Sequence, residues 1–177
     1  MRRLLGLLLV AALGALVVPE LARYRAERRV GYATNAFRVL LDRAADPETA
    51  RNVQAVGALA LSASGSLPGD PRPWMLVGSS FLVTGQPERA LEFYREAFET
   101  GERSEIDLNL GRAYGMLRRA DSENAAYVRA GWVSPEILAS LPEAPRARTE
   151  AEIRTLTVAL QEGKLDAPPP LPAEERR

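Results

Sequence analysis

The sequence predicts an all-α protein, and three observations support this fold class. The 177-residue chain is rich in Ala, Leu, Glu and Arg, which favour helices, and it lacks long stretches that alternate between apolar and polar residues. Residues that typically start and end helices recur along it. Several small and aromatic residues also recur 33 positions later, as Gly78 and Gly111 do. Such a period is typical of stacked pairs of antiparallel helices.

The composition excludes several functional classes. The 23 basic and 23 acidic residues balance, so the chain lacks the excess of positive charge that a nucleic-acid-binding protein normally needs. Neither Cys nor His is present, which excludes thiol nucleophiles, disulfides, Ser-His-Asp triads and imidazole or thiolate metal sites. The remaining carboxylates and hydroxyls form no persuasive catalytic pattern with Lys164. We therefore predict a protein that is not an enzyme, with no catalytic residue, cofactor or metal.

Residues 1–22 are predicted to form an N-terminal membrane anchor. After a basic start, the residues from Leu4 to Val18 are all apolar, and a helix over residues 4–22 can span a bilayer with some local thinning. A cleaved signal segment and a buried core helix are the alternatives. Cleavage is disfavoured because neither Ala15 nor Ala22 has a small residue two positions before it.

Charges on the two sides of the apolar run bear on its orientation. Four arginines, at positions 23, 25, 28 and 29, follow the run and two precede it, so the positive-inside rule taken literally favours a cytoplasmic body. Short N-terminal anchors nevertheless often export the body, and the absence of Cys is compatible with export. We favour a single-pass protein of the bacterial inner membrane with a periplasmic body.

Residues 23–66 are expected to form a linker and a degenerate helical hairpin, with helices over 30–44 and 47–63. The second helix begins with Asp46-Pro47-Glu48, in which Asp46 is a good N-cap and the proline fits the first turn. Asp42 and Asp46 are four residues apart and could act as paired acids, but the N-cap role explains Asp46 better.

Residues 67–136 are expected to form two helix pairs. The predicted helices cover 73–84, 87–100, 105–118 and 121–130, and glycines such as Gly85, Gly101 and Gly131 mark their ends. The two pairs align in register: Val77 with Leu110, Gly78 with Gly111, Phe81 with Tyr114, Tyr94 with Tyr127 and Ala97 with Ala130. Each glycine allows two helices to approach closely. Phe81 and Tyr114 are expected to fill the space between the helices, and Tyr94 and Tyr127 to cap the seam.

This spacing resembles the tetratricopeptide repeat, a pair of antiparallel helices that stacks into a right-handed superhelix. Residues 71–103 match the repeat closely, with Glu102 in place of the usual proline, and residues 104–136 match it more loosely. The second unit departs at three positions, where Asp107, Arg118 and Glu123 replace a large apolar residue, the turn glycine and a small residue. The resemblance implies a solenoid of about two consensus repeats with flanking helices.

The resemblance also implies a peptide-binding groove along the first helix of each pair. The candidate groove residues are Arg72, Met75, Ser79, Leu82, Leu108, Asn109, Arg112 and Met116. Some members clamp a peptide carboxylate with Asn and Lys residues, but Met75 and Ser79 stand at two of those positions here, so this clamp is not expected. A mixture of Met, Leu, Arg and Asn suits an amphipathic helix or extended peptide. The same residues could instead pack on the chain's own flanking helices.

Residues 137–165 are expected to contain a capping helix over 147–162. Thr149 and Glu152 read as a capping box at its start, and three apolar residues, Ile153, Leu156 and Leu160, would face inward. Residues 166–177 are rich in proline and charge, so we expect an extended or disordered tail there.

These features together predict a non-enzymatic, membrane-anchored adaptor or scaffold that binds a protein partner or client peptide. By the resemblance, comparable anchored repeat proteins assist envelope assembly, export or complex biogenesis. The alternative is a permanent accessory subunit of a membrane protein complex. In that case small residues such as Gly6 and Gly14 would let the anchor helix pack against other spans.

Overall fold

The computed structural model describes the backbone of residues 2–41 and 47–165, and side chains within it from Leu13 onward. In these ranges the chain forms seven α-helices and one 3₁₀-helix, with no strand. The elements are α1 (Arg2–Leu41), α2 (Pro47–Ser64), α3 (Arg72–Val83), α4 (Pro87–Glu99), α5 (Ser104–Met116), α6 (Ala120–Val133), η1 (Pro135–Ser140) and α7 (Glu143–Gln161). The prediction of an all-α protein is confirmed.

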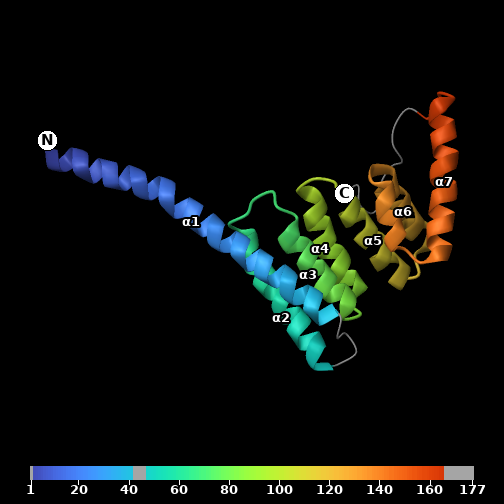
Figure 1. The fold of residues 1–177 in the computed structure, drawn as a ribbon, viewed down its shortest axis with the longest axis horizontal. Helices are drawn as coiled ribbons and strands as arrows, with labels where there is room; N and C mark the ends of the chain where they lie inside the picture. The colour runs from blue at the N-terminus through green and yellow to red at the C-terminus, as the bar shows by residue number, and fades with distance from the viewer. Residues whose placement is uncertain (1, 42–46, 166–177) are drawn as a thin grey trace.

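Successive helices pack antiparallel against one another, which makes the body a row of helical hairpins (Figure 1). The pairs are α1 with α2, α3 with α4, and α5 with α6. The first pair contacts the second where α2 packs on α3, and the second contacts the third where α4 packs on α5. The last helix, α7, packs on α6. The arrangement is therefore repeat-like, as the 33-residue period predicts.

The first helix is continuous but has two halves in different surroundings. From Ala26 onward, buried residues follow at helical spacing and pack on α2; these are Ala26, Val30, Ala33 and Phe37. Before Ala26 the helix projects from the body (Figure 1), and every side chain from residue 15 to residue 25 is exposed. The expected linker before residue 30 is helical instead, because the Ala, Arg and Glu residues in it favour helix.

Within residues 13–41 and 48–165, whose side chains are described, no helix is long and apolar enough to cross a membrane. The transmembrane helix expected over residues 1–22 is thus not identified. Met1 and the side chains of residues 2–12 lie outside the described part of the chain.

A glycine–tyrosine contact sets the spacing of both central helix pairs. A Cβ atom added to Gly78 would lie 2.6 Å from the ring of Tyr94, and one added to Gly111 would overlap the ring of Tyr127 in the same way. Each ring can lie against the first helix of its pair only because the glycine has no side chain. The same packing therefore occurs in both pairs, 33 residues apart.

The turns inside the two pairs are also equivalent. Gly85 and Arg118 both have left-handed backbone conformations, with φ angles of 73° and 57°. In each turn the next amide donates to a carbonyl five residues earlier, from Gln86 to Phe81 at 2.9 Å and from Arg119 to Tyr114 at 3.0 Å. Arg118 thus preserves the turn but holds a conformation that favours glycine.

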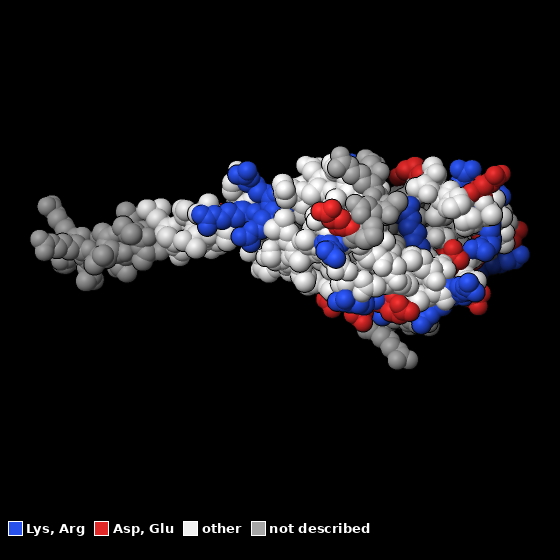
Figure 2. All heavy atoms as spheres, turned by 90° about the horizontal axis from the view of Figure 1, so that it is seen from below, with Lys and Arg blue, Asp and Glu red and all other residues white. Residues whose placement is uncertain are grey.

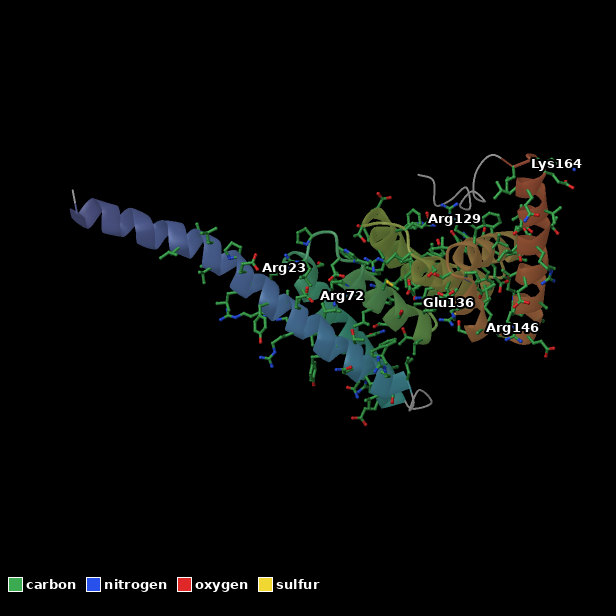
Figure 3. The ribbon with its side chains drawn as sticks, turned by 45° about the horizontal axis from the view of Figure 1, so that its top comes forward. Arg23, Arg72, Arg129, Glu136, Arg146 and Lys164 are labelled. Atoms are coloured by element: carbon green, nitrogen blue, oxygen red, sulfur yellow. The ribbon has the colours of Figure 1, made fainter. Side chains whose placement is uncertain are left out.

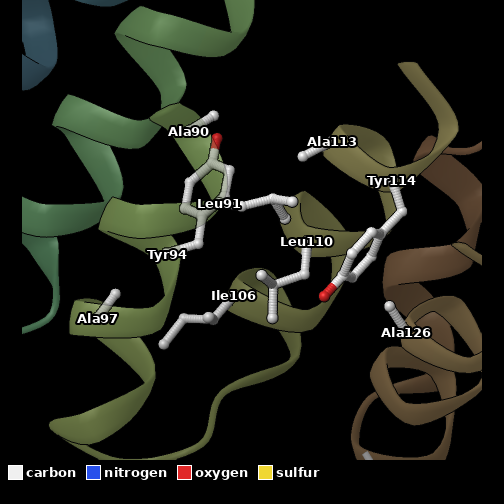
Figure 4. Close-up of a cluster of buried hydrophobic side chains, with 9 residues drawn as sticks. All are labelled: Ala90, Leu91, Tyr94, Ala97, Ile106, Leu110, Ala113, Tyr114 and Ala126. Carbon is white, nitrogen blue, oxygen red and sulfur yellow. The ribbon is translucent and has the colours of Figure 1, made fainter. Parts of the chain in front are cut away.

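The two central pairs share one hydrophobic core (Figure 4). Its buried members come from α4, α5 and α6: Ala90, Leu91, Tyr94, Ala97, Ile106, Leu110, Ala113, Tyr114 and Ala126. On α3, Trp74 and Phe81 both stack on Phe93 of α4, with ring centroids 6.4 and 5.3 Å apart. Burial of these large side chains holds α3 to α6 together as one unit.

The start of the last helix differs from its prediction. α7 begins at Glu143, not near Thr149, so the expected capping box does not form. The helix extends that far because Pro145 falls in its first turn, where no backbone N–H is needed. Thr149 is fully buried inside the helix. Leu160 is 43% exposed, so the inward-facing apolar stripe is shorter than predicted.

The segment between α6 and α7 also differs from its prediction. Gly131 does not end α6, which continues to Val133, and Leu138 and Ile153 pack directly over this glycine. Pro135 begins the short 3₁₀-helix η1, which packs on α5 and α6.

Substituting Gly111 by alanine is expected to lower the free energy of unfolding by about 1–3 kcal/mol, because the new methyl group overlaps the Tyr127 ring. Urea unfolding of the full chain in mild detergent measures this change. Gly31→Ala is the matched control, since Gly31 lies within α1 with nothing near its Cβ position, and it should gain about 0.5–1 kcal/mol. An unchanged stability of Gly111→Ala would contradict the close contact.

Substituting Arg118 by glycine should raise the free energy of unfolding by about 0.5–1 kcal/mol. Relief of the left-handed strain outweighs the added freedom of the unfolded chain. The reverse change at the equivalent turn, Gly85→Arg, should destabilise the protein. Equal midpoints for the wild type and Arg118→Gly in the same urea titration would show that the turn carries no strain.

Candidate partner-binding face

The first helices of the two central pairs, α3 and α5, carry the candidate groove residues. Because the pairs repeat after 33 residues, Met75 is equivalent to Leu108 and Ser79 to Arg112. Their surroundings differ, and each candidate is described in turn below.

Tyr94 reaches across from α4 to this face. Its ring lies against Gly78, and its hydroxyl is 3.1 Å from the hydroxyl of Ser79. Burial raises the pKa of Tyr94 to about 12, although the hydrogen bond with Ser79 and the positive charge of Arg112 act in the opposite direction. Ser79 is therefore half-buried and already engaged by its own helix pair.

Arg112 is the centre of the polar part of the face. It donates one hydrogen bond to Asn109 at 3.1 Å and another to Ser140 of η1 at 3.2 Å. Burial and nearby Glu123 raise the pKa of Tyr127 to about 12, and Arg112 opposes this shift. Because its charge acts on both Tyr94 and Tyr127, Arg112 links the two helix pairs electrostatically.

The apolar candidates are covered to different degrees. Leu108 is buried in a core cluster with Tyr127 of α6 and Leu138 of η1, so the chain itself covers this position. Met75 and Leu82 are half-buried against the central core. Met116, at the end of α5, is 50% exposed and is the most accessible of the four.

Arg72 is directed toward the first helix pair. Arg72, labelled in Figure 3, donates hydrogen bonds to Glu27 of α1 at 2.8 Å and to Asp70 at 2.5 Å. These bonds raise the pKa of Arg72, and they hold the pKa of Asp70 below its usual value against the effect of burial. Arg72 thus ties α3 to α1 and lies apart from Ser79, Asn109 and Arg112.

A buried polar group accompanies two departures from the repeat pattern. Arg129 of α6 donates two hydrogen bonds to Glu102, which stands where the repeat has proline. These bonds raise the pKa of Arg129, and the charge of Asp107, which is fully buried at the start of α5, adds to the shift. Arg129 therefore binds one of the acidic residues that weaken the resemblance, Glu102, and feels the charge of a second, Asp107.

Sequence reasoning identified Asn109 and Arg112 but missed Tyr94 and Ser140. The sequence predicts only a packing role for Tyr94 at the seam of its helix pair, although Gly78 on the facing helix is a signal that the ring can cross the pair. Ser140 carried no signal, because its position depends on η1. The Asp42–Asp46 pair lies outside the described residues. Where the structure describes side chains, no group of three acidic residues is placed to hold a metal ion.

Comparison of the chain with known family models, with curated proteins and with solved structures found no match.

Stability should fall as the pH rises from about 10 to about 12, because the folded protein holds the phenolic protons of Tyr94 and Tyr127 more tightly than the unfolded chain does. Below pH 10 both states bind these protons and the stabilisation is complete. Tyr94→Phe should make the fall shallower, whereas Tyr24→Phe, at an exposed position of α1, should not. Urea unfolding across this pH range measures the slopes, and equal slopes for both variants would contradict the assignment.

Proposed function

We propose that this chain is a non-enzymatic adaptor of the tetratricopeptide kind, anchored by one N-terminal helix in the bacterial inner membrane. Its body lies in the periplasm and holds a protein partner or client peptide beside the membrane. The partner lies along α3 and α5, close to Ser79, Asn109, Arg112 and Met116. In this role the protein assists envelope assembly, export or the biogenesis of a complex.

The uncovered half of α1 carries the proposal. Five large aliphatic side chains of this half are 44–70% exposed: Leu13, Leu16, Val17, Val18 and Leu21. They occupy several sides of a stretch of helix that projects from the body, and lipid can cover a helix from every side. The sequence continues in the same apolar manner back to Leu4, through residues whose side chains lie outside the described part.

The helical body supports a binding role over a catalytic one. Its polar groups pair with one another, Ser79 of α3 with Tyr94 of α4, and Arg112 of α5 with Asn109 and with Ser140 of η1. Met116 offers an exposed apolar side chain one helical turn along α5 from Arg112, a combination that suits an amphipathic helix or an extended peptide.

Met116→Glu should reduce recovery of the partner at least tenfold when the tagged full-length protein is purified from detergent-solubilised native membranes, because it places a charge in the apolar contact. Val133→Glu is the matched control, since Val133 is also 50% exposed but lies on α6. Arg112→Glu should weaken recovery as well. Thermal unfolding of each variant separates loss of binding from loss of fold, and equal recovery with Met116→Glu would refute this face.

The same purification distinguishes the alternative role. A permanent accessory subunit, with its anchor packed against other spans, would be recovered with membrane proteins in a fixed ratio that survives detergent. A transient adaptor would be recovered with substoichiometric partners that Met116→Glu removes.

A further inference from the structure

Four exposed arginines surround α1 where its projecting half meets the body. They are Arg23, Arg25, Arg28 and Arg29, and we call them the arginine collar. Figure 2 shows basic side chains gathered at this junction, with no acidic ones beside them on the face in view. Two exposed tyrosines, Tyr24 and Tyr32, lie among them on the same helix.

The charge of the collar is not neutralised by the rest of the described chain. Among the described residues, no ion pair or hydrogen bond engages any of the four guanidinium groups. Glu27 is the one carboxylate between Arg23 and Arg29, and Arg72 of α3 binds it at 2.8 Å. The junction therefore presents four positive charges to its surroundings.

The collar also forms a shallow hollow. Three of its members, Arg25, Arg28 and Arg29, line a space of about 530 Å³ together with Leu21, Tyr24, Tyr32 and Leu59. Its walls combine guanidinium groups and phenol rings with aliphatic carbon. A phosphate headgroup with the first carbons of its acyl chains has the matching combination of charge and apolar surface.

We propose that the arginine collar binds the headgroups of anionic phospholipids at the surface of the bilayer in which the chain is anchored. This inference rests on the proposed anchor. The proposed span ends at residue 22, so the collar begins at the next residue; from Arg23 to Arg29 it covers about 9 Å along a helix, close to the depth of the headgroup layer. Tyr24 and Tyr32 are of the type that is enriched at this interface. The collar continues directly from the apolar run, which favours a lipid surface over an acidic protein.

Vesicle flotation with two forms of the full-length chain tests the collar separately from the anchor. The first form is unmodified, and the second carries Leu8→Glu and Val10→Glu to disable the apolar run. Vesicles contain phosphatidylcholine alone or with a third of it replaced by phosphatidylglycerol. The second form should bind the anionic vesicles at least tenfold more strongly than the neutral ones, and added salt should weaken this binding.

A collar triple variant of the second form carries Arg25→Gln/Arg28→Gln/Arg29→Gln. It should partition onto anionic vesicles roughly 100-fold less, since each basic residue near such a surface raises the partition coefficient about fivefold. The matched control is Arg51→Gln/Arg146→Gln/Arg154→Gln, which changes the net charge equally at sites on α2 and α7. It should have little effect. Circular dichroism of every variant checks that the helices are intact.

Equal partitioning of the two triple variants, or equal binding to neutral and anionic vesicles, would overturn the proposal. So would a collar triple variant that keeps its vesicle binding but no longer binds polyglutamate, since that result assigns the collar to an acidic protein. Flotation of the unmodified chain on neutral vesicles reports on the anchor alone. If the unmodified chain did not float with neutral vesicles, the anchor would be refuted. The comparison of the two triple variants would still test the collar.

Discussion

The body of this protein depends on one contact, in which a tyrosine ring lies against a helix at a residue without a side chain. Gly78 and Gly111 let α3 and α5 approach their partner helices closely enough to bury Tyr94 and Tyr127. Each ring also crosses its helix pair, and the hydroxyl of Tyr94 thereby reaches Ser79 on the opposite helix. A single contact thus sets the helix spacing, the 33-residue period and part of the polar chemistry of the candidate face.

Much of the fold could be predicted because its signals are local. Proline and glycine begin and end helices through their own backbone preferences, so the bounds of α2 to α5 agree with prediction within about two residues. The errors arise where packing overrides these preferences. Gly131 stays inside α6 because Leu138 packs over it, and Thr149 is buried inside α7, which starts about one turn earlier than the predicted residue 147.

The candidate face was harder to predict because the exposure of a side chain depends on which later segment of the chain packs over its helix. Leu108 and Met116 both belong to the predicted groove on α5, and their residue types alone do not distinguish them. η1 covers Leu108 but leaves Met116 half-exposed. The packing of η1 also brings Ser140 to Arg112, a contact across 28 residues that no repeat pattern indicates. Sequence could thus name Arg112 and Asn109, but not the neighbours that define their surroundings.

Because α1 is continuous, the rotational orientation of its projecting half about the helix axis is fixed relative to the body. An α-helix turns about 100° per residue, so the face buried by Ala26 and Val30 has a fixed angular relation to every side chain before it. If the projecting half packs against other spans in a bilayer, the direction in which α3 and α5 face relative to those spans is set by the number of residues between the two halves. One added residue would turn the body by about 100°, whereas four would nearly restore its direction. In that arrangement the length of the junction, and not only its charge, would set the side from which a partner approaches.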